Sequence, residues 1–350
     1  MLTQDLADRL VGRHWGDNIK VTSLRRLERA SKSDLSLMLE PRDRRLAVTS
    51  QAGCLLISEN DAADYADLLS CTLIVIADFY AGLQKAMHLL HPPRPKSHFA
   101  GVHQSAHVHP EAQLDKDVCV FPMAYIGSAD IGSRTRIMPF VFIDDNVCIG
   151  EDCVIGAGSV VMSGTRLGHR VILQPGTILG GDGFVYYPEN ERNIKIASTK
   201  NVYIEDDVEI GANTCIDKGM LENTCIGSGS KIDNLVQIGH DVSIGKNAVV
   251  VAQVGLAGHV NIGDEAAIGG QAGVAPYRQV GQGARISATA GVFRDVSANE
   301  IVSGNPAVAH MNYLRSCAAQ KKLHAYQKDV RNLQKRIDAL SEALKDHGTR

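Results

Sequence analysis

The feature that most constrains this chain is a six-residue repeat of aliphatic side chains. Isoleucine, leucine or valine returns at every sixth position across two long, unbroken stretches. The first stretch consists of Ile131, Ile137, Ile143, Ile149, Ile155, Val161, Leu167, Leu173 and Leu179. The second consists of Ile226, Ile232, Ile238, Ile244, Val250, Leu256, Ile262, Ile268, Val274, Val280, Ile286 and Val292. Neither an α-helix nor an alternating strand produces a sustained period of six.

Three short strands per turn of a coil explain this period. Each hexad then forms one side of a triangular coil, and its aliphatic residue points to the axis. Successive coils stack as parallel strands about 4.8 Å apart. The winding is left-handed, an exception to the right-handed crossover rule for which hexapeptide repeats are the known case. We therefore predict a mainly β fold, a left-handed parallel β-helix over residues 99–305.

The repeat is interrupted twice. Residues 180–201 form a polar segment that breaks the period, and a long loop on a regular solenoid is usually functional. Ile204, Ile210 and Ile216 resume the repeat, and four extra residues then follow before Ile226.

The first 98 residues lack the repeat and predict a small α/β domain. We expect helices over residues 6–11 and 79–90 and buried strands over residues 53–58 and 73–77. The run Pro92-Pro93-Arg94-Pro95 ends this domain as a stiff linker, because a helix cannot continue through it.

Residues 306–350 predict a helical tail. Apolar residues alternate at spacings of three and four, which is the seam of a coiled coil: Leu323, Tyr326, Val330, Leu333, Ile337, Leu340 and Leu344. Such a seam needs partner helices, so we predict a homotrimer of three parallel solenoids. The outer face of the tail is basic, with Lys321, Lys322, Lys328, Arg331, Lys335 and Arg336.

Composition narrows the class of protein. The formal charge of -3 gives no reason to expect nucleic acid or an anionic membrane as partner. The eight cysteines form neither a disulfide framework nor a zinc motif. No signal peptide is visible, and the longest apolar run, residues 72–77, is too short to cross a bilayer. We expect a soluble, cytoplasmic protein without a transmembrane segment.

A candidate site lies in the polar run Lys231 to His240. Three hexads make eighteen residues, so His240 should lie beside Gly258 on the next coil. A glycine there leaves open space and a backbone N–H close to the imidazole. This pairing offers a general base and an oxyanion donor on one wall.

The residues around this site resemble a known family. The run Asp233-Asn234-Leu235-Val236-Gln237-Ile238-Gly239-His240 is similar to a signature of the UDP-3-O-(3-hydroxyacyl)glucosamine N-acyltransferases of lipid A biosynthesis. Further matching segments are residues 206–214, Ile216-Asp217-Lys218-Gly219, Asp182-Gly183-Phe184 and Ser303-Gly304-Asn305-Pro306-Ala307. The resemblance extends from about Phe99 to the end of the chain.

The resemblance implies a homotrimeric hexapeptide-repeat acyltransferase. It would move a 3-hydroxyacyl chain from acyl carrier protein to the 2-amino group of a UDP-amino-sugar, without a metal or other cofactor. His240 would be the general base and the Gly258 N–H the oxyanion donor. Asn234 and Gln237 would position substrate, with Asp233 as a weaker orienting candidate. The basic face of the tail would suit an acidic carrier protein.

The chain departs from the family at two places. The family usually has a second histidine where this chain has Tyr277, one coil after His259. We expect His259 and Tyr277 to be stacked neighbours and His259 to contact the phosphate or pantetheine of a substrate. In the N-terminal domain, expected to bind the uridine of the nucleotide sugar, Leu37 and Asp43 stand where the family has stacking aromatic residues.

Other functions remain open from the sequence. An O-acyltransferase acting on another UDP-sugar is one, although the separate N-terminal domain and the Asp233–Gln237 motif speak against it. A metal enzyme of the γ-carbonic anhydrase type would need three converging histidines, and the late coils offer His240 and His259. A non-enzymatic scaffold predicts no loss when His240 is replaced. The acyl chain length and the exact acceptor sugar stay undetermined.

Overall fold

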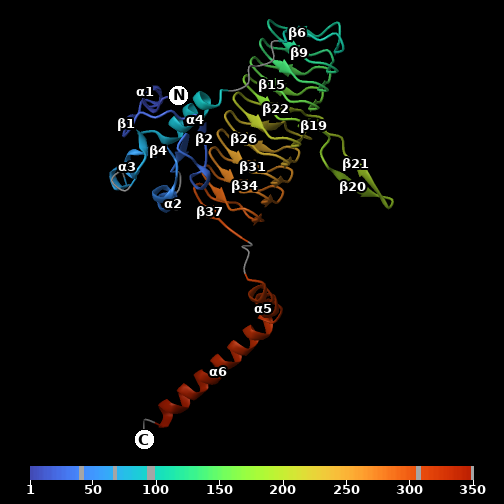
Figure 1. Ribbon diagram of the computed structural model, residues 1–350. Coiled ribbons are helices and arrows are strands. Elements are labelled where there is room, and N and C mark those ends of the chain that lie inside the picture. The colour runs from blue at the N-terminus through green and yellow to red at the C-terminus, as the bar shows by residue number, and fades with distance from the viewer. Residues whose placement is uncertain (39–42, 66–68, 93–98, 305–308, 348–350) are drawn as a thin grey trace. The chain divides into compact units, whose positions relative to one another are not determined.

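The computed structural model describes residues 1–38, 43–65, 69–92, 99–304 and 309–347 (Figure 1). The chain divides into two compact units, Met1–His98 and Phe99–Arg350. Most of the predicted proline linker, from Pro93 onward, lies outside the described residues.

The N-terminal unit is a five-stranded sheet between helices. Strands β2, β3, β4 and β5 run parallel, and β1 pairs antiparallel with β5. Leu56 and Ile74 face one core with residues of α1 and α4, whereas Leu55 and Ile57 face another. The elements are α1 (Thr3–Leu10), β1 (Arg13–Trp15), β2 (Ser23–Leu24), η1 (Leu27–Arg29), β3 (Asp34–Leu37), α2 (Asp43–Thr49), β4 (Cys54–Ser58), α3 (Glu59–Tyr65), β5 (Thr72–Ile76) and α4 (Phe79–Leu90).

The predicted helices and strands of this unit are confirmed as α1, β4, β5 and α4. The strands β2 and β3 and the helices α2 and α3 were not predicted, because they are short and carry no sustained apolar period.

The second unit is a parallel β-helix, which confirms the fold class predicted from the repeat. Its strands form three sheets, which we name the first, second and third faces in chain order. The first face contains β7 (His107–Val108), β10 (Tyr125–Ile126), β13 (Phe142–Ile143), β16 (Val160–Val161), β19 (Ile178–Gly181), β24 (Cys215–Asp217), β27 (Gln237–Ile238), β30 (Gly255–Leu256), β33 (Gly273–Val274) and β36 (Gly291–Val292). The second face contains β8 (Gln113–Leu114), β11 (Asp130–Ile131), β14 (Cys148–Ile149), β17 (Arg166–Leu167), β22 (Val202–Ile204), β25 (Thr224–Ile226), β28 (Ser243–Ile244), β31 (Asn261–Ile262) and β34 (Gln279–Val280). The third face contains β6 (Gly101–Val102), β9 (Cys119–Val120), β12 (Arg136–Ile137), β15 (Val154–Ile155), β18 (Ile172–Leu173), β23 (Glu209–Ile210), β26 (Lys231–Ile232), β29 (Val249–Val250), β32 (Ala267–Ile268), β35 (Arg285–Ile286) and β37 (Ile301–Val302).

The repeated aliphatic residues form the core of this β-helix. Each stacks in register on its equivalent in the next coil, as in the pairs Ile143↔Val161 and Ile238↔Leu256. Every repeat member from Ile131 to Val292 is buried. A continuous column of branched side chains therefore holds the coils together along the axis.

The coils turn at three corners, which we define by the faces they join. The site corner joins the first face to the second, the ladder corner joins the second to the third, and the third corner closes the coil. Both interruptions of the repeat lie at the site corner, on successive coils. The first carries the hairpin of β20 (Tyr186–Glu189) and β21 (Arg192–Lys195), which projects from the solenoid in Figure 1. The second is a bulge, residues 218–223, between β24 and β25.

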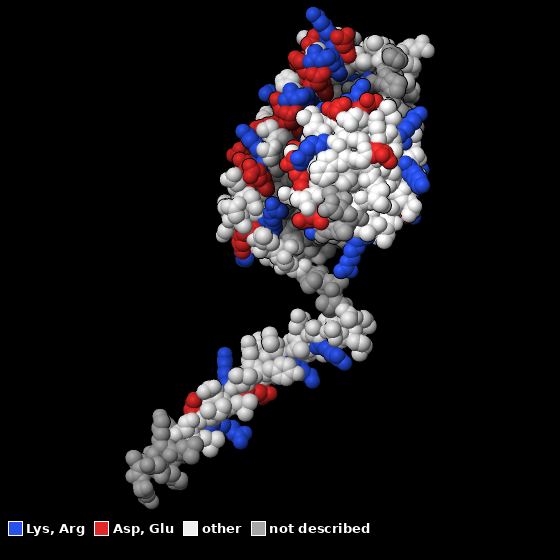
Figure 2. Space-filling model, turned by 60° about the vertical axis from the view of Figure 1, so that its left-hand side comes forward, with Lys and Arg blue, Asp and Glu red and all other residues white. Residues whose placement is uncertain are grey.

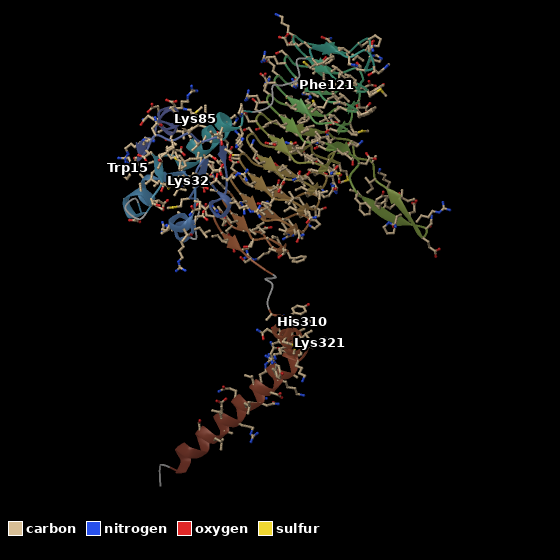
Figure 3. The ribbon with its side chains drawn as sticks, viewed as in Figure 1. Trp15, Lys32, Lys85, Phe121, His310 and Lys321 are labelled. Carbon is tan, nitrogen blue, oxygen red and sulfur yellow. The ribbon has the colours of Figure 1, made fainter. Side chains whose placement is uncertain are left out.

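The tail contains α5 (His310–Lys321) and α6 (Leu323–His347), as predicted. Figure 3 labels His310 and Lys321 at the two ends of α5. The seam residues from Leu323 to Leu340 are all exposed in the single chain. Figure 2 shows basic side chains along this tail among uncharged and some acidic ones. None of the helices in the described part of the chain has the length and hydropathy to span a membrane.

Candidate active site

His240 stands at the site corner, two residues after the buried Ile238 of β27. It faces a cavity of about 730 Å³ that is lined by side chains of the site corner and of the hairpin segment. Gln237, Gly258, His259 and Tyr277 line the same cavity. The stack of coils therefore brings together five of the seven residues that the sequence singled out.

The next residue, Asp241, fixes the orientation of the imidazole. Its Oδ2 lies 2.6 Å from His240 Nδ1, and the Asp241 side chain is only 2 % exposed. The bulge on the preceding coil wraps around this carboxylate. The backbone N–H groups of Met220, Leu221 and Glu222 all donate to it, at 3.0, 2.8 and 2.6 Å.

These contacts determine the charge of Asp241 and the tautomer of His240. Burial opposes ionisation of Asp241, but the hydrogen bonds from Glu222, His240, Met220 and Leu221 outweigh it and lower its pKa to about 2. An ionised carboxylate can only accept hydrogen bonds, so the proton of a neutral His240 must be on Nδ1. The lone pair of Nε2 is then free to take a proton from a substrate.

Two glycines leave room for the His240 ring. A Cβ on Gly258 would lie 2.5 Å from Nε2, and a Cβ on Gly183 would lie 3.0 Å from the ring carbons Cγ and Cδ2. His240 and Gly258 are therefore neighbours on successive coils, as the repeat predicted. Gly183 was not predicted, and it belongs to the base of the hairpin segment.

Among the described residues, the backbone N–H of Gly258 has no acceptor, in contrast to several N–H groups at the same repeat position. At several corners the N–H two residues after the buried aliphatic position donates to a side-chain oxygen of a neighbouring coil. Seven corners within the described residues show such bonds, from Ser128, Ser163, His169, Ala212, Ser228, Lys246 and Ala252. The corresponding place one coil beyond Gly258 is Pro276, which carries no acceptor. Among the hydrogen bonds within the described residues, none uses the Gly258 N–H, so it can receive an oxyanion.

His259 and Tyr277 continue along the same corner on the next two coils. Their rings stack at 4.6 Å with an angle of 7° between planes, as expected from their spacing. The His259 ring also meets the His240 ring edge-on at 5.0 Å. Together they extend the wall of the cavity along the solenoid axis.

Asp233 and Asn234 lie elsewhere in the single chain. They stand at the third corner and line a separate cavity of about 460 Å³ with Glu209 and Lys231. Their side chains bind backbone N–H groups, Asp233 that of Ala252 at 3.1 Å and Asn234 that of Ala212 at 2.7 Å. Within this chain the hydrogen-bond partner of His240 is thus Asp241, and Asp233 does not contact it.

The hairpin segment supplies the rim of the cavity. Phe184 and Tyr186 line it, with their rings 5.0 Å apart, and Phe184 is 86 % exposed. Asp182 anchors the segment through ion pairs with Lys195 of β21 and Lys218 of the bulge. The interruption at residues 180–201 therefore contributes directly to the site.

His240, Asp241 and His259 are the group of possible metal ligands that the described residues bring within 4.8 Å of one another. In this group His240 Nδ1 and Asp241 Oδ2 already bind each other. A metal ion could use Asp241 only by breaking that bond and competing with three N–H donors, so the donor set fits a metal poorly.

Leu37 and Asp43 lie at the end of β3 and the start of α2. The residues between them that were compared with the family's aromatic stretch include positions 39–42, which lie outside the described residues.

Known proteins resemble this chain closely. The family model for the bacterial transferase hexapeptide (six repeats) matches residues 128–162 and 149–181. The UDP-3-O-acylglucosamine N-acyltransferase of Anaeromyxobacter dehalogenans (strain 2CP-1) is 39% identical over 344 residues, covering 96% of each chain. UDP-3-O-acylglucosamine N-acyltransferase 1 of Gloeobacter violaceus is 38% identical, covering 97% of each. Among solved structures, a UDP-N-acetylglucosamine acyltransferase of Bacteroides fragilis is 25% identical, covering 59% of this chain and 72% of that one, with a TM-score of 0.49.

Proposed function

The chain belongs to the family of UDP-3-O-acylglucosamine N-acyltransferases, and we propose that it performs this reaction at the site corner, with His240 as the general base. The enzyme acts in lipid A biosynthesis and acylates the amino group of a UDP-3-O-acylglucosamine. We assign the donor as a 3-hydroxyacyl thioester of acyl carrier protein, because a thioester-to-amide exchange runs downhill without a metal or redox cofactor.

The geometry supports a simple sequence of proton transfers. His240 Nε2 takes a proton from the 2-amino group as its nitrogen attacks the thioester carbonyl carbon. The oxyanion that forms accepts a hydrogen bond from the Gly258 N–H. When the C–S bond breaks, the thiolate leaves and receives the proton from His240, which gives an amide and the free thiol. Asp241 holds Nδ1 and stabilises the imidazolium between the two transfers.

One observation carries this proposal: an oriented imidazole and a vacant N–H lie side by side on one wall of a cavity. At seven comparable corners, such as that of Ala252, a side-chain oxygen of a neighbouring coil accepts a hydrogen bond from this N–H. Here it is free and stands beside a base whose other nitrogen is held by a buried carboxylate.

Gln237, His259 and Tyr277 are our candidates for substrate contacts within the same cavity. Their chemistry suits the polar parts of both substrates, and His259 could contact a phosphate or the pantetheine. We assign the uridine to the N-terminal unit, with Leu37 and Asp43 in place of stacking aromatic residues.

Asp233 and Asn234 can serve the same site only in an assembly of chains. We propose a homotrimer in which a groove between neighbouring solenoids holds the acyl chain, and the exposed seam of α6 supports this assembly. Mixed trimers of His240→Ala and Asn234→Ala subunits test it. If the two residues belong to different subunits, mixing restores part of the activity, whereas residues of one subunit give no restoration.

The basic outer face of the tail is our candidate surface for acyl carrier protein. Reversing Lys328 and Lys335 to Glu should raise the KM for the acyl carrier protein and leave the KM for the sugar unchanged. An equal change in both constants would argue against this surface. From these substrates we propose that the reaction takes place in the cytoplasm.

The central experiment combines 3-hydroxyacyl carrier proteins of several chain lengths with UDP-sugars that carry either an amino or a hydroxyl group at C2. We expect wild type to form an amide with the amino sugar, and His240→Ala to form almost none while keeping its oligomeric state. An ester formed with the hydroxyl sugar would instead indicate an O-acyltransferase. Equal rates for wild type and His240→Ala would refute the assignment of the base.

A further inference from the structure

Asp217 is a carboxylate in the cavity to which the reaction above gives no role. It is the last residue of β24, one coil before His240, and it lines the cavity with Gln237 and His240. Its register partner on the preceding coil is Gly181, and continuation of the β24–β27 register places it beside Gly239. Because neither glycine has a side chain, the carboxylate is left uncovered along the stack.

Two other carboxylates of this corner, Asp182 and Asp241, are already engaged. Asp182 binds Lys195 and Lys218, and Asp241 binds His240 and three backbone N–H groups. Asp217 accepts a single side-chain hydrogen bond, from Gln237 Nε2 at 3.2 Å. Within the described residues it forms no ion pair, so most of its capacity to accept hydrogen bonds is free.

The surroundings of Asp217 favour a cation. Burial raises its pKa to about 6, against the hydrogen bond from Gln237 and the attraction of His240, and Asp182 repels it. The thiol of Cys215 lies on the same strand, and the nearby Lys195 and Lys218 are committed to Asp182. A positively charged group that enters the cavity would therefore compensate Asp217 without displacing a protein partner.

We propose that Asp217 is the residue that recognises the amino group of the acceptor. Resting on the proposed function, this assignment explains how the site distinguishes a 2-amino sugar from a 2-hydroxy sugar. An amino group offers several N–H donors and, when protonated, a positive charge. A hydroxyl group offers one donor and no charge. The carboxylate holds the nitrogen in front of His240 Nε2 and takes no part in the acyl transfer.

The test measures binding of two acceptors that differ only at C2, UDP-3-O-acylglucosamine and UDP-3-O-acylglucose, by calorimetry. All measurements are made in the His240→Ala variant, so that neither turnover nor titration of the His240 imidazole interferes. Adding Asp217→Asn should lower the affinity for the amino sugar by about 10- to 100-fold and the affinity for the hydroxy sugar by less than about 3-fold. The matched control is Asp130→Asn on β11, which leaves both affinities unchanged.

The pH dependence provides a second readout. Between pH 7 and pH 5 the sugar amine stays mostly protonated, while Asp217 passes from ionised to neutral. Affinity for the amino sugar in the His240→Ala background should fall about 10-fold over this range, and the fall should vanish with Asp217→Asn. Equal weakening of both acceptors, or a pH dependence that survives Asp217→Asn, would overturn the assignment. Failure of the His240→Ala protein to bind the amino sugar at all, when wild type also forms no amide, would overturn the proposed function itself.

Discussion

The site corner and the ladder corner are equivalent turns of the β-helix, but their polar groups are paired in opposite ways. At the ladder corner, Arg134 binds both oxygens of Asp152 at 2.8 and 2.7 Å, and Arg170 binds both oxygens of Asp207 at 2.6 and 2.7 Å. At the site corner, the carboxylate of Asp241 turns inward to a bulge and the Nε2 of His240 faces the cavity. The N–H of Gly258 has no acceptor in the part of the chain that the structure describes.

This difference shows what a regular fold needs in order to acquire chemistry. At the ladder corner, the arginine and aspartate side chains named above pair with each other, so they are not available to a ligand. The site corner departs from the repeat by two insertions and two glycines, and it leaves one base and one donor unpaired. Residues at equivalent repeat positions in the two corners therefore make matched pairs for experiment.

The largest effect is expected for His240→Ala. Because no other described group is held in the same place, kcat should fall by about 10²- to 10⁴-fold, with an unchanged melting temperature. His169 occupies the same repeat position at the ladder corner, so His169→Ala should keep full activity. Comparable losses in the two variants, measured by steady-state kinetics, would erase the distinction between the corners.

The next largest effect is expected for Gly258→Ala. The new Cβ would lie 2.5 Å from His240 Nε2, which forces the imidazole away from the oxyanion donor. We expect kcat to fall by about 10²- to 10³-fold. Gly255→Ala serves as the control for folding, since a Cβ there meets nothing within 4 Å, and both variants should melt like wild type. A fully active Gly258→Ala enzyme would remove this N–H from the mechanism.

Asp241→Asn should reduce kcat by about 10- to 100-fold, because an orienting partner of the base is lost. It should also remove a pH-dependent part of the stability. The folded pKa of Asp241, about 2, lies below the unfolded value of about 3.9. The ionised carboxylate therefore adds roughly 2 kcal/mol to the free energy of unfolding of wild type above pH 4, and this contribution is lost as the pH falls through 2. Denaturant melts between pH 7 and pH 2 measure this difference. An acid profile identical to that of wild type would contradict the buried, ionised carboxylate.

The smallest effect is expected for Arg170→Gln at the ladder corner. Its partners, Asp206 and Asp207, are exposed, so solvent screens the ion pairs and little stability depends on them. Activity should be unchanged, and any drop in melting temperature should disappear in high salt. A loss of activity would mean that this corner takes part in catalysis after all.

The sequence predicts the β-helix and the meeting of His240 with Gly258 because both follow from one period. Register is exact in a stack of hexads, so residues eighteen apart must be neighbours. The stacking of His259 on Tyr277 follows for the same reason. Asp241 could not be recognised in this way, since aspartates also stand at this repeat position in the ladder corner. Only the four extra residues before Ile226 distinguish it, and their backbone conformation is not encoded by any period.

The placement of Asp233 and Asn234 shows a second limit. Their nearness to His240 in the sequence suggested one polar cluster, but a corner and a strand separate them. They stand at the third corner, where each completes a backbone turn. Resemblance to a family identifies such residues as a group, whereas only the winding of the chain shows which of them share a wall.

The hydrogen bonds between the bulge and Asp241 join two coils that are synthesised one after the other. A nascent chain that has left the ribosome as far as Glu222 presents three backbone donors with no anion to fill them. The next winding brings that anion and, with it, the correctly held imidazole. The imidazole of His240 is therefore held in its orientation only once both coils have formed.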